Sequence, residues 1–495
     1  MLTGFVLAAL LAVIAPIPPA PLTHSLTATM EHQIDDLGSR IFREQRSPGL
    51  AIGVVEDGRI VYARGFGYAN LARHTRFEPS TQTYVGSISK QFTAAAVLLL
   101  VQDGKLKLDD PVTRYVPELT IAKGVTIREL LDQTAGLPDE LALQGIDQDR
   151  TKTIKLSDLI AAMNKLQPLS PPGSQYRYNN FNYAIAGLIV ERVSGIPLSD
   201  YLEQHVFIPL AMNQTFLAGD RGISPQHAVG YTGSPGSFTP AKPWDPAWLF
   251  GDGGVVTNVY DLAKWDIGFP LVLRVDAERE MFTPSGAPGA LQYGLGWVVD
   301  ERGGKRYVWH NGEIAGYHAM NALLPDDHVA VIVLANTDLL HSRDVVTPEQ
   351  VAAEILDIVV PPQRAQIDNA VVDRATEWLG RIANKNIDRT QLTPAFSTYL
   401  TDDLLVRANF AAFGKPLDII PIASTTQSDG DTLYEFLVRF QHGQYHYRFG
   451  LTPDGKIYEI YLLPQSSPSA RRRPVASTTL PSIVTASARV ALLNI

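Results

Sequence analysis

Alternation of apolar and polar residues defines the first clear element of the chain. Residues 50–67 alternate and are rich in β-branched side chains on both sides of Asp57-Gly58. Such a pair adopts the positive φ angles that a tight β-turn requires. The pattern therefore predicts a β-hairpin over residues 50–67, preceded by an amphipathic helix near residues 30–46.

Helical periodicity dominates the middle of the chain, and strand patterns return after it. Residues 90–201 carry helical patterns broken by Pro and Gly, whereas residues 307–310, 317–324 and 329–334 have strand patterns separated by turns. This order predicts an α+β fold: an antiparallel sheet flanked by helices, whose first and last strands meet, with a helical insertion between them. The chain lacks the strict alternation of strands and helices that a doubly wound sheet requires.

Shifts in composition divide the chain further. Residues 30–362 form the predicted main domain, which ends at a Pro-Pro pair. An amphipathic helix over residues 367–383 and three hairpin-like strands after it predict a small β-rich accessory domain over residues 366–464, either α+β or barrel-like. Residues 465–495 are rich in Ser, Pro, Ala and Arg, which predicts a flexible tail.

The start of the chain has the features of an export signal. Residues 5–14 form an uninterrupted apolar run that is followed by a Pro-rich stretch. We therefore expect residues 1–25 to be a signal peptide and the protein to be periplasmic or secreted. No Lys or Arg precedes the run, so an uncleaved N-terminal membrane anchor is the alternative, although about ten residues are too few to span a bilayer as a helix.

Charge and residue usage exclude several classes of function. The 42 Lys and Arg residues stand against 51 Asp and Glu, for a net charge of −9, so nucleic acid is not an expected partner. The chain has no Cys, which excludes disulfides, thiolate metal sites and a Cys nucleophile. Covalent chemistry then requires Ser, Thr, Lys, Tyr, His or a carboxylate.

The strongest candidate for covalent chemistry is the segment Ser87-Ile88-Ser89-Lys90, which stands directly before an apolar stretch. A Ser at a helix start and a Lys three residues later lie on one face of the helix. A Lys held in a dry, apolar helix has a lowered pKa and can take the proton of the Ser hydroxyl. Taken alone the pattern is weak, because the ordinary role of a Ser at this position is a helix N-cap.

Two further segments offer partners for this pair. Tyr178 and Asn180 form a Tyr-x-Asn pattern before a helix, which supplies a phenol for proton relay and an amide for substrate. His310 and Gly312 lie at the end of a predicted strand, where the Gly permits close approach of a substrate backbone. An aromatic loop that packs the core and a structural His are the respective alternatives.

These motifs and several others resemble the serine β-lactamase and penicillin-binding-protein superfamily. The branch concerned contains class C β-lactamases, D-aminopeptidases, D,D-carboxypeptidases and related esterases, and the resemblance implies a β-lactamase/transpeptidase-like fold over roughly residues 30–360. Besides the three motifs above, the segments that carry it are residues 47–50, 130–138, 253–257 and 293–297.

The resemblance implies a role for each of these residues. Ser87 is implied to be the acyl-enzyme nucleophile, Lys90 its base partner and Tyr178 the general acid or base. The backbone amides of Ser87 and Glu313 are implied to form the oxyanion hole. No metal and no organic cofactor is implied.

The third motif departs from the family pattern in a way that bears on substrate. His310, Asn311 and Gly312 take the place of the family's Lys-Thr-Gly, with Asn180 and this segment binding substrate. A His is largely neutral near pH 7, so it attracts a substrate carboxylate less than a Lys does. Glu313 adds a negative charge, which either pairs with a substrate amine or points into solvent.

The sequence therefore predicts a serine hydrolase that acts through an acyl-enzyme on esters, small amides or short peptides, including ones with D-amino acids. A D,D-carboxypeptidase of cell-wall peptides or a β-lactamase is one alternative. A penicillin-recognising sensor or scaffold without turnover is the other. Trp244, Trp248 and Phe250 are expected either to line an acyl pocket or to pack the core. The oligomeric state is left open.

Overall fold

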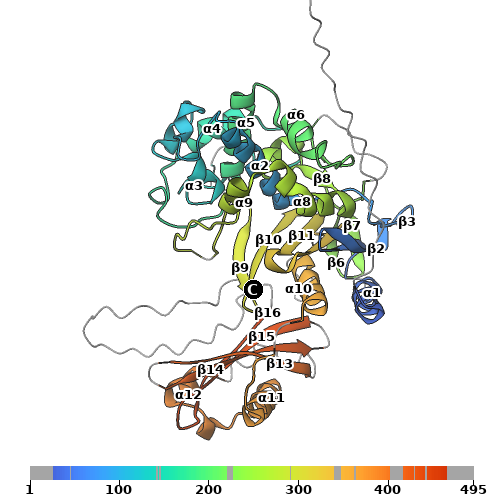
Figure 1. Cartoon of the computed structure of the whole chain (residues 1–495), viewed down its shortest axis with the longest axis vertical. Helices are drawn as coiled ribbons and strands as arrows, with labels where there is room; N and C mark the ends of the chain where they lie inside the picture. Colours follow the sequence, from blue (N-terminus) through green and yellow to red (C-terminus); the bar gives the residue numbers. More distant parts are fainter. Residues whose placement is uncertain are drawn as a thin grey trace, which may run out of the picture.

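The computed structural model describes residues 26–44, 46–140, 143, 147–219, 227–289, 291–338, 347–361, 364–401, 416–427, 430–440 and 443–464. The predicted signal peptide and the predicted tail both lie outside these residues. Figure 1 shows the described chain as a larger part, formed by residues 26–361, above a smaller part formed by residues 364–464.

Within the described residues, a seven-stranded sheet runs through the larger part in the order β3-β2-β1-β12-β11-β10-β9. Adjacent strands pair antiparallel, and β1 pairs with β12, with Leu50 opposite Ala335. The prediction of an antiparallel sheet whose first and last strands meet is therefore confirmed. The strands are β1 (Gly49–Glu56), β2 (Arg59–Asn70), β3 (Thr75–Arg76), β9 (Val298–Arg302), β10 (Lys305–Ile314), β11 (Tyr317–Leu324) and β12 (Val329–Ala335).

The predicted hairpin between β1 and β2 is also present. Asp57 has φ +48° and Gly58 has φ +72°, which are the left-handed conformations that a two-residue hairpin turn requires. Short strands elsewhere form two small sheets. These are β4 (Thr83–Tyr84), β8 (Val255–Thr257) and β5 (Phe216–Leu217) in one sheet, and β6 (Tyr231–Ser234) and β7 (Ser237–Pro240) in the other.

Helices cover both faces of the main sheet, as the side chains of β11 show. His318 contacts Glu349 of α10, whereas Asn321, three residues later and therefore on the opposite face, contacts Asp266 of α8. The helices of the larger part are α1 (Ala28–Arg43), α2 (Ser89–Gln102), α3 (Ile127–Leu131), α4 (Leu156–Met163), α5 (Asn180–Ser194), α6 (Leu198–Leu202), α7 (Phe250–Gly253), α8 (Val259–Val272), α9 (Val275–Met281) and α10 (Pro348–Val359).

Helix α2 lies at the centre of the larger part (Figure 1). Every residue from 89 to 98 is buried, because the helix is apolar on nearly all sides and is enclosed by its neighbours. Three consecutive Ala residues, which are the strongest helix formers, stabilise it. Lys90 in its first turn is fully buried, so an amine is held inside an apolar element.

The smaller part has a hydrophobic core of its own, centred on Trp378, Tyr447 and Phe449. Its described strands form an open four-stranded antiparallel sheet in the order β13-β14-β15-β16, and α11 lies along the sheet in Figure 1. The predicted α+β class with an extra β-rich region is therefore correct. The elements are α11 (Asn369–Ala383), α12 (Pro394–Tyr399), β13 (Pro416–Thr426), β14 (Thr432–Phe440), β15 (Gly443–Leu451) and β16 (Ile457–Pro464).

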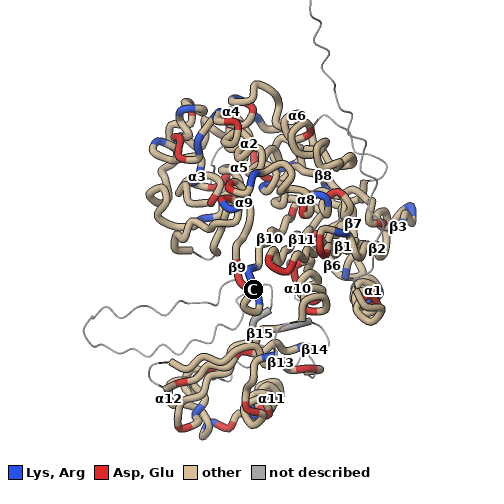
Figure 2. The backbone as a smooth tube through the Cα atoms, viewed as in Figure 1, with Lys and Arg blue, Asp and Glu red and all other residues tan. Residues whose placement is uncertain are grey.

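The charged residues are spread over both parts of the molecule. In the view of Figure 2, Lys and Arg residues and Asp and Glu residues are both found in the larger and in the smaller part. Among the described residues, no helix has both the length and the apolarity needed to cross a bilayer.

Candidate active site

Ser87 lies in a single 3-10 turn, Gly86–Ile88, immediately before α2. The N-cap residue of α2 is Ile88, and no side chain caps the helix. The alternative that Ser87 is an ordinary N-cap is therefore wrong. The Ser87 side chain is only half-buried, so its hydroxyl is accessible from the surface while Lys90 behind it is not.

Two proton carriers contact the Ser87 hydroxyl. Lys90 Nζ lies 2.9 Å from Ser87 Oγ, and it also donates to Asn180 Oδ1 at 2.8 Å and to the carbonyl oxygen of Asp252 at 2.9 Å. Tyr178 OH lies 2.7 Å from the same Ser87 oxygen. The structure thus brings Ser87, Lys90, Tyr178 and Asn180, which are up to 93 positions apart in the sequence, into one hydrogen-bonded group.

Burial shifts the pKa values of these two carriers in opposite directions. It lowers the pKa of Lys90 to about 8, although the negative charges of Asp252, Glu140 and Asp139 oppose the shift. Burial raises the pKa of Tyr178, and the same carboxylates add to the increase, while the hydrogen bond to Ser87 opposes it. Near neutral pH, Lys90 is therefore able to lose its proton, whereas Tyr178 stays a phenol that can donate one.

The segment before Tyr178 is held by Gln133, which has φ +63°. The carbonyl of Gln133 accepts from Arg177 N at 2.8 Å, and its side-chain Oε1 accepts from Asn179 N at 3.1 Å and from Asn182 Nδ2 at 2.8 Å. Gln133 belongs to the segment 130–138 that carries part of the family resemblance. This segment therefore positions the Tyr-x-Asn loop against Ser87.

Two glycines permit β10 to approach the turn that carries the nucleophile. A Cβ atom at Gly312 would lie 1.8 Å from the carbonyl oxygen of Val85 and 2.9 Å from Ser87 N. A Cβ atom at Gly86, which has φ +50°, would lie 2.5 Å from Glu313 N. Neither position has room for a Cβ atom, so the strand and the turn lie in close contact at Ser87 and Glu313. An oxyanion hole formed by the amides of these two residues stays a prediction.

His310 is buried beside this group. Its Nε2 lies 2.8 Å from the hydroxyl oxygen of Tyr293, and its Nδ1 contacts the carbonyl oxygen of Asn311. Burial lowers the pKa of His310 to about 3, and the charge of Lys90 acts in the same direction. His310 is therefore neutral at physiological pH, and both ring nitrogens have protein partners. Direct contact of His310 or Gly312 with substrate stays a prediction.

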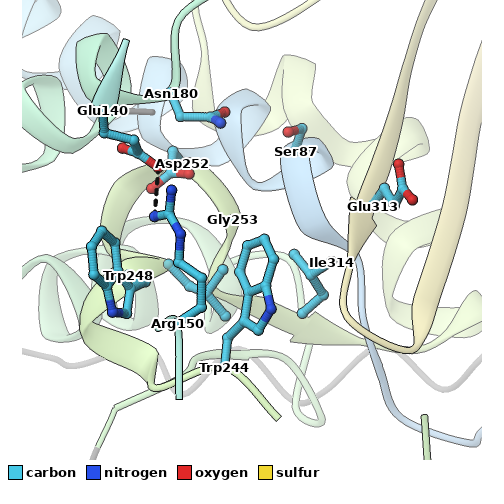
Figure 3. A pocket seen from close by; sticks show the side chains of 11 residues that line it. Ser87, Glu140, Arg150, Asn180, Trp244, Trp248, Asp252, Gly253, Glu313 and Ile314 are labelled. Atoms are coloured by element: carbon cyan, nitrogen blue, oxygen red, sulfur yellow. Dashed lines mark hydrogen bonds and ion pairs between the residues drawn. The ribbon is translucent and has the colours of Figure 1, made fainter. Parts of the chain in front are cut away.

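A cavity of about 110 Å³ opens beside Ser87 (Figure 3). Its walls combine carboxylates, one guanidinium and aromatic rings. The residues that line it are Ser87, Glu140, Arg150, Asn180, Trp244, Trp248, Leu249, Asp252, Gly253, Glu313 and Ile314. Trp244 and Trp248 thus line a pocket, whereas Phe250 packs on α5, where a Cβ atom at Gly187 would lie 2.9 Å from its ring.

Of the charged residues of the cavity, only Glu313 was predicted as functional; Glu140, Arg150 and Asp252 were not. Glu140 Oε1 pairs with Arg150 Nη1 at 2.9 Å, and the guanidinium lies 4.0 Å from the centroid of the Trp248 ring. Burial raises the pKa of Glu140 to about 7 and that of Asp252 to about 6. The one available signal in the sequence was Asp139-Glu140, an acidic pair directly after the segment 130–138.

Comparison with known proteins identifies the family of this chain. Residues 26–354 match the β-lactamase family over a stretch that contains every predicted site residue. The chain belongs to the β-lactamase family. The resemblance to serine β-lactamases and penicillin-binding proteins is therefore confirmed, and the family supports the prediction of a hydrolase.

Two individual proteins show how much of the chain is similar to known relatives. Protein flp of Staphylococcus aureus strain MW2 is 28% identical over 323 residues, which is 63% of this chain and 64% of flp, so the chain spans less than two thirds of that relative. The octameric penicillin-binding protein homologue from Pyrococcus abyssi shares the fold with a TM-score of 0.60 and 22% identity, over 88% of this chain and 98% of its own.

A D-amino acid amidase from Ochrobactrum anthropi SV3 shares the fold with a TM-score of 0.60 and 22% identity. The likeness covers 67% of this chain and 99% of the amidase. The likeness to the Pyrococcus homologue covers 88% of this chain, which is more than the larger part contains. It therefore continues into residues 364–464. At these identities the two solved structures show the fold.

Proposed function

We propose that this β-lactamase-family protein is a serine hydrolase that forms an acyl-enzyme at Ser87 and acts on esters and small amides. The observation that carries the proposal is the contact of one half-buried hydroxyl with two proton carriers: Lys90 Nζ at 2.9 Å and Tyr178 OH at 2.7 Å from Ser87 Oγ. A Ser hydroxyl becomes a nucleophile when a positioned base removes its proton.

The contacts support the following order of steps. Neutral Lys90 takes the proton of Ser87 as Oγ attacks the substrate carbonyl, and the amides of Ser87 and Glu313 stabilise the resulting oxyanion. The leaving group then departs with a proton from Tyr178, which recovers one from Lys90. In deacylation a water molecule attacks the ester carbonyl, the same pair takes its proton, and Ser87 Oγ is released protonated.

The charge of the site favours substrates without a carboxylate next to the scissile bond. A buried, neutral His310 stands where the resemblance places a Lys, so that position offers no cation to a carboxylate. Both β-lactams and peptides that end in D-Ala carry such a group. The fold shared with a D-amino acid amidase supports small amides, including those of D-amino acids, as the class to test first.

A substrate panel tests this proposal directly. Nitrophenyl esters, D-amino acid amides and β-lactams are given to the protein and to Ser87→Ala. We expect turnover of the first two classes, little β-lactam hydrolysis, and loss of all turnover in the variant. Hydrolysis of a penicillin at the rate of a simple ester contradicts the substrate assignment. Stable labelling by a fluorescent penicillin without turnover of any compound favours the sensor instead.

A further inference from the structure

Two buried hydroxyl groups of helix α2 have no part in the proposed mechanism. Ser89 is 0% exposed and Thr93 is 1% exposed. Because they are four residues apart, they lie on one face of the helix, next to Lys90. A hydroxyl group is costly to bury in an apolar helix unless it is hydrogen-bonded. The partners of these two groups therefore indicate what they do.

Both hydroxyl groups contact the backbone of residues 251–255. Thr93 Oγ1 donates to the carbonyl oxygen of Gly251 at 2.6 Å, and Ser89 Oγ accepts from Val255 N at 2.9 Å. Between these two contacts lies Asp252, whose carbonyl oxygen accepts from Lys90 Nζ at 2.9 Å. One face of α2 therefore carries the base and also the two hydroxyl groups that hold the segment in which one acceptor of that base lies.

The same segment is confined by other elements of the site. A Cβ atom at Gly251 would lie 2.5 Å from the carbonyl oxygen of Tyr183 in α5, the helix that begins at Asn180. The carbonyl oxygen of Val255 accepts from Val85 N at 3.1 Å, two residues before the nucleophile. Residues 251–255 thus lie in contact with the helix and the turn that supply the other groups around the base.

The carbonyl of Asp252 matters because of how a neutral amine uses its hydrogen atoms. Neutral Lys90 has two N–H donors and one lone pair. Asn180 Oδ1 at 2.8 Å and the carbonyl of Asp252 at 2.9 Å accept the two N–H groups, which leaves the lone pair for the Ser87 hydroxyl at 2.9 Å. If one acceptor moves away, the amine can rotate, and a misplacement of about 1 Å can cost roughly 100-fold in rate.

We propose that Thr93 and Ser89 are positioning residues for the base: they hold the backbone of residues 251–255 so that the carbonyl of Asp252 orients the Lys90 amine toward Ser87. This inference rests on the proposed function, in which Lys90 takes the proton of Ser87. The two hydroxyl groups act through the backbone and are not catalytic residues.

Two substitutions at Thr93 test the inference on the full chain. Thr93→Val keeps the shape of the side chain and removes the donor, whereas Thr93→Ser keeps the hydroxyl. The measurement is the second-order rate of Ser87 labelling by a neutral fluorophosphonate from pH 5.5 to 9.5. We expect the plateau rate at high pH to fall at least tenfold in Thr93→Val and to stay within threefold of the wild type in Thr93→Ser. A wild-type plateau in Thr93→Val, or equal losses in both variants, overturns the inference.

The pH midpoint of labelling separates positioning from a loss of stability. A carbonyl stabilises an ammonium more than a neutral amine, because hydrogen bonds from charged donors are stronger. Displacement of the Asp252 carbonyl therefore lowers the pKa of Lys90, and we expect the midpoint of Thr93→Val to move to lower pH by about half a unit. A wild-type midpoint overturns the role of this carbonyl. The titratable groups that face Lys90 are all retained in the variant, namely Asp139, Glu140, Tyr178, Asp252 and His310.

The smaller part of the molecule offers a matched control. Thr376 Oγ1 donates to the carbonyl oxygen of Val372 in α11 at 2.8 Å, so Thr376→Val removes the same kind of hydrogen bond far from Lys90 in the sequence. We expect its plateau and midpoint to equal those of the wild type. Ser89→Ala, which removes the acceptor of Val255 N, is expected to change the plateau in the same direction as Thr93→Val. Thermal unfolding of each variant establishes that it is folded at the assay temperature.

The same assay distinguishes this inference from the proposed function. Labelling of Ser87 in the wild type with a rate that rises with pH, together with wild-type behaviour of Thr93→Val, overturns only the positioning role. Absence of labelling and of turnover in the folded wild type overturns both.

Discussion

Single residues at this site owe their chemistry to burial. The Lys90 ammonium has three hydrogen-bond acceptors, namely Ser87 Oγ, Asn180 Oδ1 and the carbonyl of Asp252, yet its enclosure in α2 lowers its pKa to about 8. Tyr178 is enclosed as well, and its pKa is raised. One environment therefore prepares a base and an acid on the two sides of one oxygen, because burial disfavours the charged form of each.

The pKa of Lys90 predicts the pH dependence of acylation. Below pH 8 the amine is mostly protonated and cannot accept the Ser87 proton, so the rate of labelling by a neutral fluorophosphonate is expected to rise about tenfold per pH unit. It levels off above a midpoint near pH 8. The measurement is the second-order labelling rate from pH 5.5 to 9.5. A rate that is constant across this range contradicts the role of Lys90.

The hydroxyl of Tyr178 is predicted to act mainly on the leaving group. Tyr178→Phe keeps the ring and removes the proton donor, so kcat for an anilide is expected to fall roughly 100- to 10,000-fold. Labelling by a fluorophosphonate is expected to fall much less, because fluoride departs without a proton. Steady-state kinetics and labelling rates on the same preparation give the two numbers. Equal losses in both assays would place Tyr178 in activation of Ser87 alone.

At the scale of elements, the site depends on how closely β10 approaches the turn before α2. Gly312 has no space for a side chain, since a Cβ atom would lie 1.8 Å from the carbonyl oxygen of Val85. By contrast, Gly380 in α11 has nothing within 4 Å of the position of a Cβ atom. Substitution by Ala is therefore expected to change the stability of the protein in opposite directions at Gly312 and Gly380.

Gly312→Ala is expected to lower the free energy of unfolding by about 1–3 kcal/mol, because the strand must move away from the turn. Gly380→Ala, the control, is expected to raise it by about 0.5–1 kcal/mol, since Ala favours a helix. Urea unfolding monitored by circular dichroism gives both values. If Gly312→Ala is as stable as the wild type and retains its activity, the close approach of the two backbones is wrong.

Most elements of the larger part could be predicted because their signals are local. The Asp57-Gly58 turn and the alternation around it specify the hairpin, and the buried β-branched run specifies β12, whereas β11 is delimited by the turn-rich segments on either side of it. Strand β13 was missed because it contains Pro416 and Pro421 and is only partly buried over most of its length, so it lacks an alternating pattern.

The acidic cavity could not be predicted for a different reason. Ser87, Lys90 and Tyr178 belong to motifs that are readable in the sequence, whereas Glu140 and Asp252 meet only because residues more than 100 positions apart fold against each other. Nothing in the local pattern distinguishes Glu140 from an exposed acidic residue. Its place in the cavity follows from a tertiary contact, which no spacing rule encodes.

On the scale of the whole molecule, the two parts have separate hydrophobic cores. They meet where β15 contacts α10, and α10 is the helix whose Glu349 accepts a hydrogen bond from Asn311 of β10 at 2.7 Å. The residues of the predicted site all lie in the part that matches the β-lactamase family. The smaller part therefore touches the helix that holds β10 next to His310, and it supplies none of the predicted site residues.

Removal of residues 364–495 is predicted to change substrate range more than reactivity of Ser87. A truncated protein that retains a cooperative thermal transition is compared with the full chain in fluorophosphonate labelling and in the substrate panel. We expect labelling rates within about threefold of the full chain, since the site residues are all retained. Complete loss of labelling in a truncated protein that is folded refutes the separation of roles.

Peptide mass spectrometry of the covalently modified protein tests the central claim most directly. The wild type is incubated with a neutral fluorophosphonate at pH 8 and digested, and the modified residue is located by fragmentation. A single adduct on Ser87 that forms in the wild type and is missing in Lys90→Ala, with Ser89 unmodified in both, is the predicted result. An adduct on another residue, or equal modification of Ser87 when Lys90 is removed, contradicts the proposed catalytic pair.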